Sequence, residues 1–169
     1  MNSPGGSSRK QILSIIWAAM IGSIPIYWFI NGVVRGQRPT QNSLALFAQI
    51  LAGFAVVAYA FAWWWFRWSI GSISLKVTPT NIPQLAEQDR QAITQRLQTS
   101  VIICCAFLES PPIWGLVNSI ASTPYPYFFE WSAAFSILGF LILRFTGFPA
   151  VFELLDRLDT GQSATSMTA

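Results

Sequence analysis

Four long segments of this chain are nearly free of charge, and they constrain its fold more than any other feature. Residues 11–32 and 43–66 contain no Asp, Glu, Lys or Arg. Residues 100–120 contain one such residue, Glu109, and residues 127–145 contain Glu130 near their start and Arg144 near their end. A helix that crosses a bilayer core of about 30 Å needs about 20 mostly apolar residues. The sequence therefore predicts an all-α, polytopic membrane protein with transmembrane helices over these four ranges.

The composition agrees with a membrane protein and excludes several kinds of chemistry. Charged residues make up only 10% of the 169, whereas 53% are hydrophobic, and soluble domains carry about 25% charged residues. The absence of His excludes His-ligated haem, His-containing zinc sites and His-based catalytic triads. Neither a phosphate-binding glycine loop nor an acidic metal motif occurs in the sequence. We therefore expect a protein that is not an enzyme and has no cofactor, no metal and no nucleic-acid partner.

The basic residues predict the orientation in the membrane. With four helices, both termini and the loop over residues 67–99 lie on one side of the bilayer, which then carries eight of the ten Lys and Arg residues. The other side carries Arg35 and Arg38. Because basic residues accumulate on the cytoplasmic side, we expect both termini to be cytoplasmic. The first apolar segment is too long for a signal peptide and lacks a small-residue cleavage site, so we expect a retained helix.

The remaining segments predict little additional structure around one membrane domain over residues 9–159. Residues 1–8 and 160–169 are small and polar, which predicts disorder. Residues 69–83 read as an extended loop, and the following helix formers predict a cytoplasmic helical stalk that runs into the third helix. Residues 146–149 are expected to break the chain. Residues 150–159 then predict a short amphipathic helix on the membrane surface.

An internal repeat relates the first and third apolar segments at an offset of 87 residues. Residues 15–32 and 102–119 are identical at seven of eighteen positions, among them Ser23/Ser110, Pro25/Pro112 and Asn31/Asn118. Chance similarity between apolar helices is the alternative, but shared Pro, Ser and Asn are not composition effects. The pattern favours two duplicated hairpins inserted in parallel. Within the repeat, Gly22 stands where Glu109 stands in the second copy.

Glu109 is the strongest candidate for a functional residue. It lies near the middle of the third apolar segment, where an ionised carboxylate costs a few kcal/mol, so it should be neutral or paired. Pro111 and Pro112 follow, and each lacks the N–H that a helix would use, which predicts a kink; Pro25 predicts another in the first helix. Gln49 and Ser110 could join Glu109 in a proton or cation site. The alternative is a structural carboxyl group that forms a hydrogen bond across the bundle.

Other candidates point to packing or to the membrane interface. Small residues spaced by three or four let helices approach closely in lipid. Cys104 and Cys105 read as small core residues, and Glu130 as an interface residue at a helix start. The expected packing residues are Ser14, Ala18 and Gly22 in the first helix and Ala45, Ala48 and Ala52 in the second.

The segment around Glu109, AFLESPPIWGLV over residues 106–117, resembles the carboxylate-bearing helix of the rotary ATPase proteolipid, subunit c. The resemblance lies in a carboxylate followed by an aromatic-Gly-Leu-Val run, here Trp114 to Val117. It also lies in a polar cytoplasmic loop before that helix, and in a carboxylate kept in only one of two hairpins. If this resemblance holds, it implies that Glu109 takes the ion-binding role of the family.

Three functions from different classes follow as hypotheses. The first is a non-enzymatic accessory or scaffold subunit of a membrane complex, with the bilayer as its surroundings and further copies or other membrane subunits as its partners. The second is a protein that binds or translocates protons or cations through Glu109. An intramembrane enzyme that acts on lipid is the third, and the absence of His disfavours it.

Overall fold

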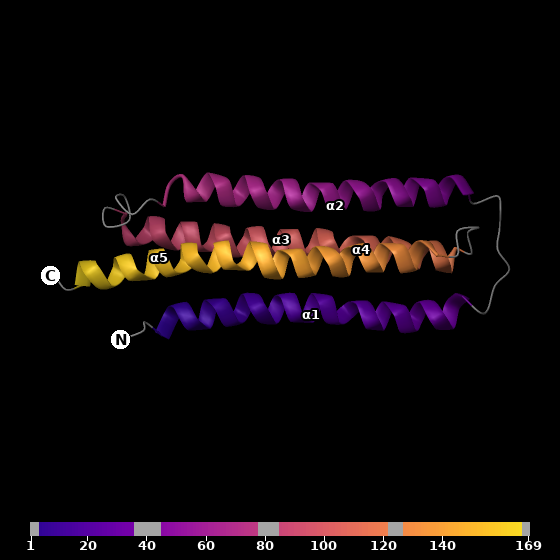
Figure 1. Ribbon diagram of the computed structural model, residues 1–169, viewed down its shortest axis with the longest axis horizontal. Helices are drawn as coiled ribbons and strands as arrows, with labels where there is room; N and C mark the ends of the chain where they lie inside the picture. The colour runs from indigo at the N-terminus through magenta and orange to yellow at the C-terminus, as the bar shows by residue number, and fades with distance from the viewer. Residues whose placement is uncertain (1–3, 36–44, 78–84, 122–126, 167–169) are drawn as a thin grey trace.

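A computed structural model describes residues 4–35, 45–77, 85–121 and 127–166, and within these ranges the chain is all-helical and contains no strand. Figure 1 shows long rods that lie side by side along one axis. The elements are α1 (Pro4–Arg35), α2 (Ala45–Ser74), α3 (Glu87–Ile120), α4 (Phe128–Ile142), the π-helix η3 (Leu143–Gly147) and α5 (Phe148–Ser166).

Four helical spans are long and apolar enough to cross a membrane, which confirms the predicted fold class. They are Ser8–Val34, Ala45–Ser74, Glu87–Ile120 and Phe128–Asp159. Each is longer than the roughly 20 residues that a bilayer core requires, and both termini lie at one end of the bundle with the end of α2 and the start of α3 (Figure 1). The predicted spans are therefore correct at their centres, and the helices continue beyond them.

Helix α3 is the centre of the bundle, because α1, α2 and α4 all pack against it. In Figure 1, α2 and α1 are the two outermost rods, with α3 and the α4–α5 rod between them. Along the described residues α1 packs on α3, α4 and α5 rather than on α2. The two hairpins of the predicted repeat therefore differ in packing: α3 and α4 are neighbours, whereas α1 and α2 are not.

Small residues allow the closest helix approaches. A Cβ atom placed on Gly115 of α3 would lie 2.8 Å from the Cα of Phe129 in α4. A Cβ on Gly139 would meet Leu108 at 2.7 Å, and one on Gly147 would meet Phe66 of α2 at 2.8 Å. Since lipid provides no hydrophobic drive between helices, such close van der Waals packing is a principal source of stability in a membrane bundle.

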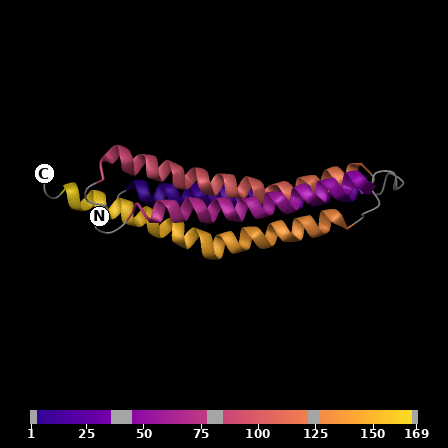
Figure 2. The same cartoon turned by 90° about the horizontal axis from the view of Figure 1, so that it is seen from above.

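The fourth span differs from the sequence prediction, because the chain does not break at residues 146–149. Instead α4 widens into η3, where the Phe148 N–H donates to the Leu143 carbonyl, and helical structure resumes directly in α5. Pro149 cannot donate a hydrogen bond, and in a regular helix its ring would clash with the carbonyl of Phe145. The wider π turn accommodates this proline, so the rod continues past it with a bend, as Figure 2 shows.

Helix α5 does not lie on the membrane surface as predicted. It continues the α4 rod, and its apolar stripe is buried in the same core cluster as Leu97 of α3 and Ile73 of α2. The stripe comprises Val151, Leu154, Leu155 and Leu158. The predicted stalk before the third helix is helical from Glu87 onward, but it packs into the bundle, since Arg90, Thr94 and Leu97 are buried. Apolar spacing predicted the buried face of α5 correctly, but the partner of this face is protein rather than lipid.

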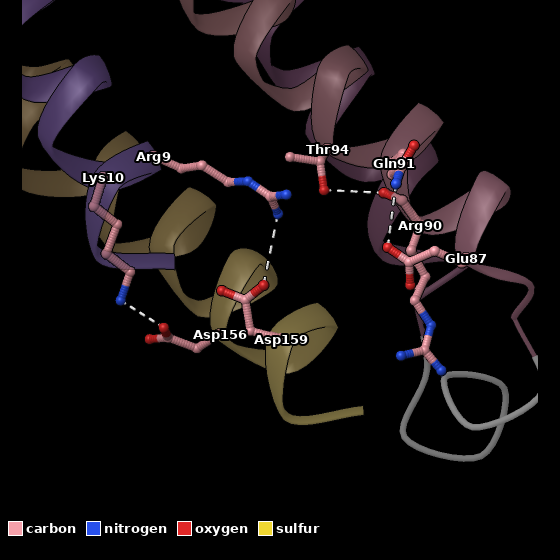
Figure 3. Close-up of polar contacts among 8 residues, drawn as sticks. All are labelled: Arg9, Lys10, Glu87, Arg90, Gln91, Thr94, Asp156 and Asp159. Carbon is pink, nitrogen blue, oxygen red and sulfur yellow. Dashed lines mark hydrogen bonds and ion pairs between the residues drawn. The ribbon is translucent and has the colours of Figure 1, made fainter. Parts of the chain in front are cut away.

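Parts of the terminal segments, which were predicted to be disordered at 1–8 and 160–169, are helical; residues 1–3 and 167–169 lie outside the described residues. Helix α1 already begins at Pro4, and α5 extends to Ser166. Ion pairs join the two terminal helices: Arg9 lies 3.6 Å from Asp159, and the Lys10 ammonium lies 2.5 Å from the Asp156 carboxylate (Figure 3). These pairs hold α1 beside α5 at the end of the bundle that carries the termini.

Candidate functional site

Glu109 lies deep in the bundle, on the side of α3 that faces α1. It is eleven residues before Ile120, the last residue of α3, which corresponds to about 16 Å along a helix axis. That distance is close to half of a bilayer core of about 30 Å. The side chain is half-buried, so the carboxyl group lies neither in the packed core nor fully on the outer surface. A position of Glu109 near the bilayer midplane remains a prediction from this helix length.

Two hydroxyl groups of α1 contact this carboxyl group. The Ser23 Oγ lies 2.6 Å from the Glu109 Oε1, and the Tyr27 hydroxyl lies 2.8 Å from the same oxygen. Ser23 and Tyr27 are four residues apart, so they lie on one face of α1. The carboxyl group of α3 is thus connected to α1 across the bundle.

The Ser23 hydroxyl has a second neighbour, so the number of hydrogen-bonding protons in this cluster can be compared with the number of contacts. Its Oγ also lies 2.6 Å from the Met20 carbonyl oxygen, an acceptor within α1. The three contacts of this cluster need three protons, whereas Ser23 and Tyr27 supply only two. With a neutral Glu109 the carboxyl proton is donated to Ser23, and Ser23 donates to Met20. With an ionised Glu109 the Ser23 hydroxyl turns to donate to the carboxylate instead.

The prolines beside Glu109 do not end the helix. Pro111 and Pro112 are buried inside α3, which continues to Ile120. Pro111 removes the N–H that would bond to the Phe107 carbonyl, and the Ser110 Oγ donates to that same carbonyl at 2.9 Å. Ser110 thus replaces a lost backbone donor, and its recorded hydrogen bond goes to α3 itself rather than to Glu109.

We predict that Ser110→Ala destabilises the protein, because it leaves the Phe107 carbonyl without this donor inside the membrane. The expected loss is about 1–3 kcal/mol, the cost of an unsatisfied buried polar group, measured by unfolding in mixed detergent micelles. Ser74→Ala is the matched control, since the Ser74 Oγ makes the same kind of bond, to Gly71, but is exposed. Equal losses in the two variants would contradict this role of Ser110.

The other predicted site residues do not gather around Glu109. Gln49 is exposed near the start of α2, whereas the hydroxyl groups that contact the Glu109 carboxyl group come from Ser23 and Tyr27 of α1. Pro25 is exposed within a continuous α1. Of the predicted packing residues, Ala48 is buried in α2, whereas Ala18 and Gly22 of α1 are exposed. Ser14, Ala45 and Ala52 are half-buried.

An apolar cavity of about 360 Å³ lies between α2, α3 and α4. Pro111 of α3 lines it, together with Tyr59 of α2 and Trp131 of α4. The contacts of Glu109 are directed instead to α1, so the cavity and the carboxyl site are separate features. No group of three or more potential metal ligands occurs in the described part of the chain. Cys104 and Cys105 are buried and unbridged, as their reading as core residues predicted.

Sequence reasoning missed Ser23 and Tyr27 as the partners of Glu109. Both were visible as repeat positions, opposite Ser110 and Trp114, but the repeat does not show which helices become neighbours. Their spacing of four residues in an uncharged segment was the available signal. It could have indicated a polar face on α1 that requires a partner from another helix.

The fold therefore defines an all-α protein with four helices able to span a membrane. Comparison of the chain with models of known families, with curated proteins and with solved structures finds no match.

Proposed function

We propose that this protein is a non-enzymatic integral membrane protein that serves as a small accessory or scaffold subunit of a membrane complex. In this proposal both termini are cytoplasmic, and the partners are further copies of the chain or other membrane subunits. The c-like character of the third helix belongs to the proposal and rests on residues 106–117.

The low burial of α1 carries this proposal. Only 11% of its apolar window is buried within the chain, compared with 44% of the window in α3. Its outward surface combines large apolar side chains, such as Trp28 and Phe29, with the small residues Ala18 and Gly22. A Cβ atom on Gly22 would have no neighbour within 4 Å, so this surface has room for a closely packed second helix.

The test is the native mass of the protein, extracted from its own membrane in a mild detergent, with every co-purifying chain identified. We expect a particle larger than one chain in its detergent micelle. Replacing Gly22 by Leu should release the partner while the isolated chain keeps its helix content, and Gly53→Leu on α2 is the control. A wild-type chain that is stable and monomeric without any partner would contradict the proposal.

A second function, reversible binding of a proton or cation at Glu109, is favoured by the proton count of the carboxyl cluster. The Ser23 Oγ lies 2.6 Å from both the Met20 carbonyl oxygen and the Glu109 Oε1. Its hydroxyl can therefore donate to Met20 while it accepts from a protonated Glu109, or it can donate to the carboxylate once the carboxyl proton has left. Such a site can accept or release a proton without a rearrangement of the helices.

A further inference from the structure

A row of cations and aromatic rings follows the seam between α1 and the rod formed by α4, η3 and α5. The Arg144 Cζ lies 5.9 Å from the centre of the Trp17 ring and 5.5 Å from that of Phe148. Further along, the Lys10 Nζ lies 5.6 Å from the centre of the Phe152 ring. The rod residues of this row are spaced by four, and the row therefore continues along one face from η3 into α5.

The cations of this seam differ in their acidic partners. Arg9 pairs with Asp159 and Lys10 with Asp156, as Figure 3 shows. Arg144 is half-buried, and within the described residues it has no acidic partner. The only recorded contacts of its guanidinium in that part of the chain are the two aromatic rings.

Arg144 also lies deeper in the bundle than the paired cations. Its neighbour Trp17 is seven residues further along α1 than Lys10, a distance of about 10 Å along the helix. Trp17 belongs to the uncharged segment of α1, so Arg144 lies at the edge of the apolar layer. Arginines within transmembrane segments are rare and are usually found at functional sites.

The geometry leaves this guanidinium ready to bind an anion. The rings of Trp17 and Phe148 contact the guanidinium through their π faces and accept none of its N–H groups in a hydrogen bond. Its N–H donors can therefore form two parallel bonds to phosphate oxygens. The Trp17 ring is held in place by its own Nε1–H, which donates to the Phe140 carbonyl at 3.0 Å. Phe140 precedes η3 by one turn, and π turns within helices frequently occur at functional sites.

We infer that Arg144, Trp17 and Phe148 form a binding site for the phosphate of an anionic phospholipid at the membrane end that carries both termini. Charge complementarity favours an anionic lipid over a zwitterionic one. The acidic side chains of α5 already neutralise Arg9 and Lys10, whereas Arg144 retains a full positive charge. The ammonium group of a zwitterionic lipid would bring a second cation toward this charge.

The test is native mass spectrometry of the full-length protein in detergent with added lipid. At equal lipid concentrations, we expect more bound phosphatidylglycerol than phosphatidylcholine. Arg144→Gln should weaken phosphatidylglycerol binding about tenfold, as expected for loss of a charged hydrogen-bonding group. Arg67→Gln is the matched control. Arg67 is an exposed arginine of α2, so this substitution removes the same charge at a position outside the seam.

Several results would overturn the inference. Equal binding of the two lipids, or an equal loss in Arg144→Gln and Arg67→Gln, would show that no specific site exists at Arg144. Thermal protection by inorganic phosphate to the same degree as by phosphatidylglycerol would indicate a free-anion site instead. Should Arg144→Gln fail to fold, Arg144→Lys keeps the charge but loses the paired donors, and unchanged lipid binding in that variant would contradict the inference.

Discussion

Replacing Gly115 by Ala is expected to cost about 1–3 kcal/mol of stability, the range for overpacking a close-packed interior. The added methyl group would lie 2.8 Å from the Phe129 Cα and would also overlap the Ser132 hydroxyl. Because one of these neighbours is backbone, the strain can be relieved only if α3 and α4 move apart. Reversible unfolding in mixed micelles, followed by circular dichroism, measures the loss.

Gly53→Ala is the matched control for this prediction. Gly53 also lies within a transmembrane helix, but a Cβ atom there would have no neighbour within 4 Å. Replacing glycine by alanine in an open helical position favours the helix by about 1 kcal/mol. The two substitutions should therefore change stability in opposite directions. A neutral Gly115→Ala variant would show that α3 and α4 do not approach as closely as described.

A hydrophobic carbodiimide is expected to modify the wild-type protein at Glu109, and Glu109→Gln is expected to abolish that modification. The reagent reacts with the protonated acid, so the rate should fall as the pH rises. Peptide mapping distinguishes Glu109 from Glu130, which lies in the first turn of α4. Modification that is independent of pH, or that occurs only at Glu130, would exclude reversible proton binding at Glu109.

Two further variants, Glu109→Leu and Tyr27→Phe, test the structural role of this carboxyl group. Glu109→Leu removes the acceptor of the Tyr27 hydroxyl. It should cost about 0.6 kcal/mol, the average for hydrogen bonds between transmembrane helices, and at most about 1.7 kcal/mol. In Tyr27→Phe the further substitution Glu109→Leu should then cost less, because that bond is already absent. If Glu109→Leu lowers stability but the wild-type protein does not react with the carbodiimide, the structural role of Glu109 is the one that these results support.

The apolar length and charge pattern of the sequence were sufficient to predict the four spans. Length and hydropathy depend on the bilayer alone, which is why residues 11–32 and 100–120 could be assigned without knowing their neighbours. The expected depth of Glu109 in the bilayer rests on its position within residues 100–120. The even number of helices placed both termini at one end, as the structure shows (Figure 1). The Lys and Arg counts assign that end to the cytoplasm, which remains a prediction.

Helix partners could not be predicted from the same information. Periodicity identified the apolar face of residues 151–158 but could not distinguish lipid from protein as its partner, since both are apolar. The partners of Glu109 depend on α1 lying beside α3, which is a property of the assembled bundle. From local sequence alone, Pro149 predicts the end of a helix. Only the packing of η3 and α5 onto the core shows that the helical rod continues past it.

The central place of α3 has a consequence for how this chain is made. A membrane protein is synthesised from its N-terminus, so α1 and α2 enter the bilayer before α3 exists. In the described structure these two helices do not pack on each other, and the main neighbour of each is α3. Until α3 is synthesised, α1 and α2 are therefore in the membrane without their main native contacts. Neither helix can form its main native contacts until α3 has been inserted.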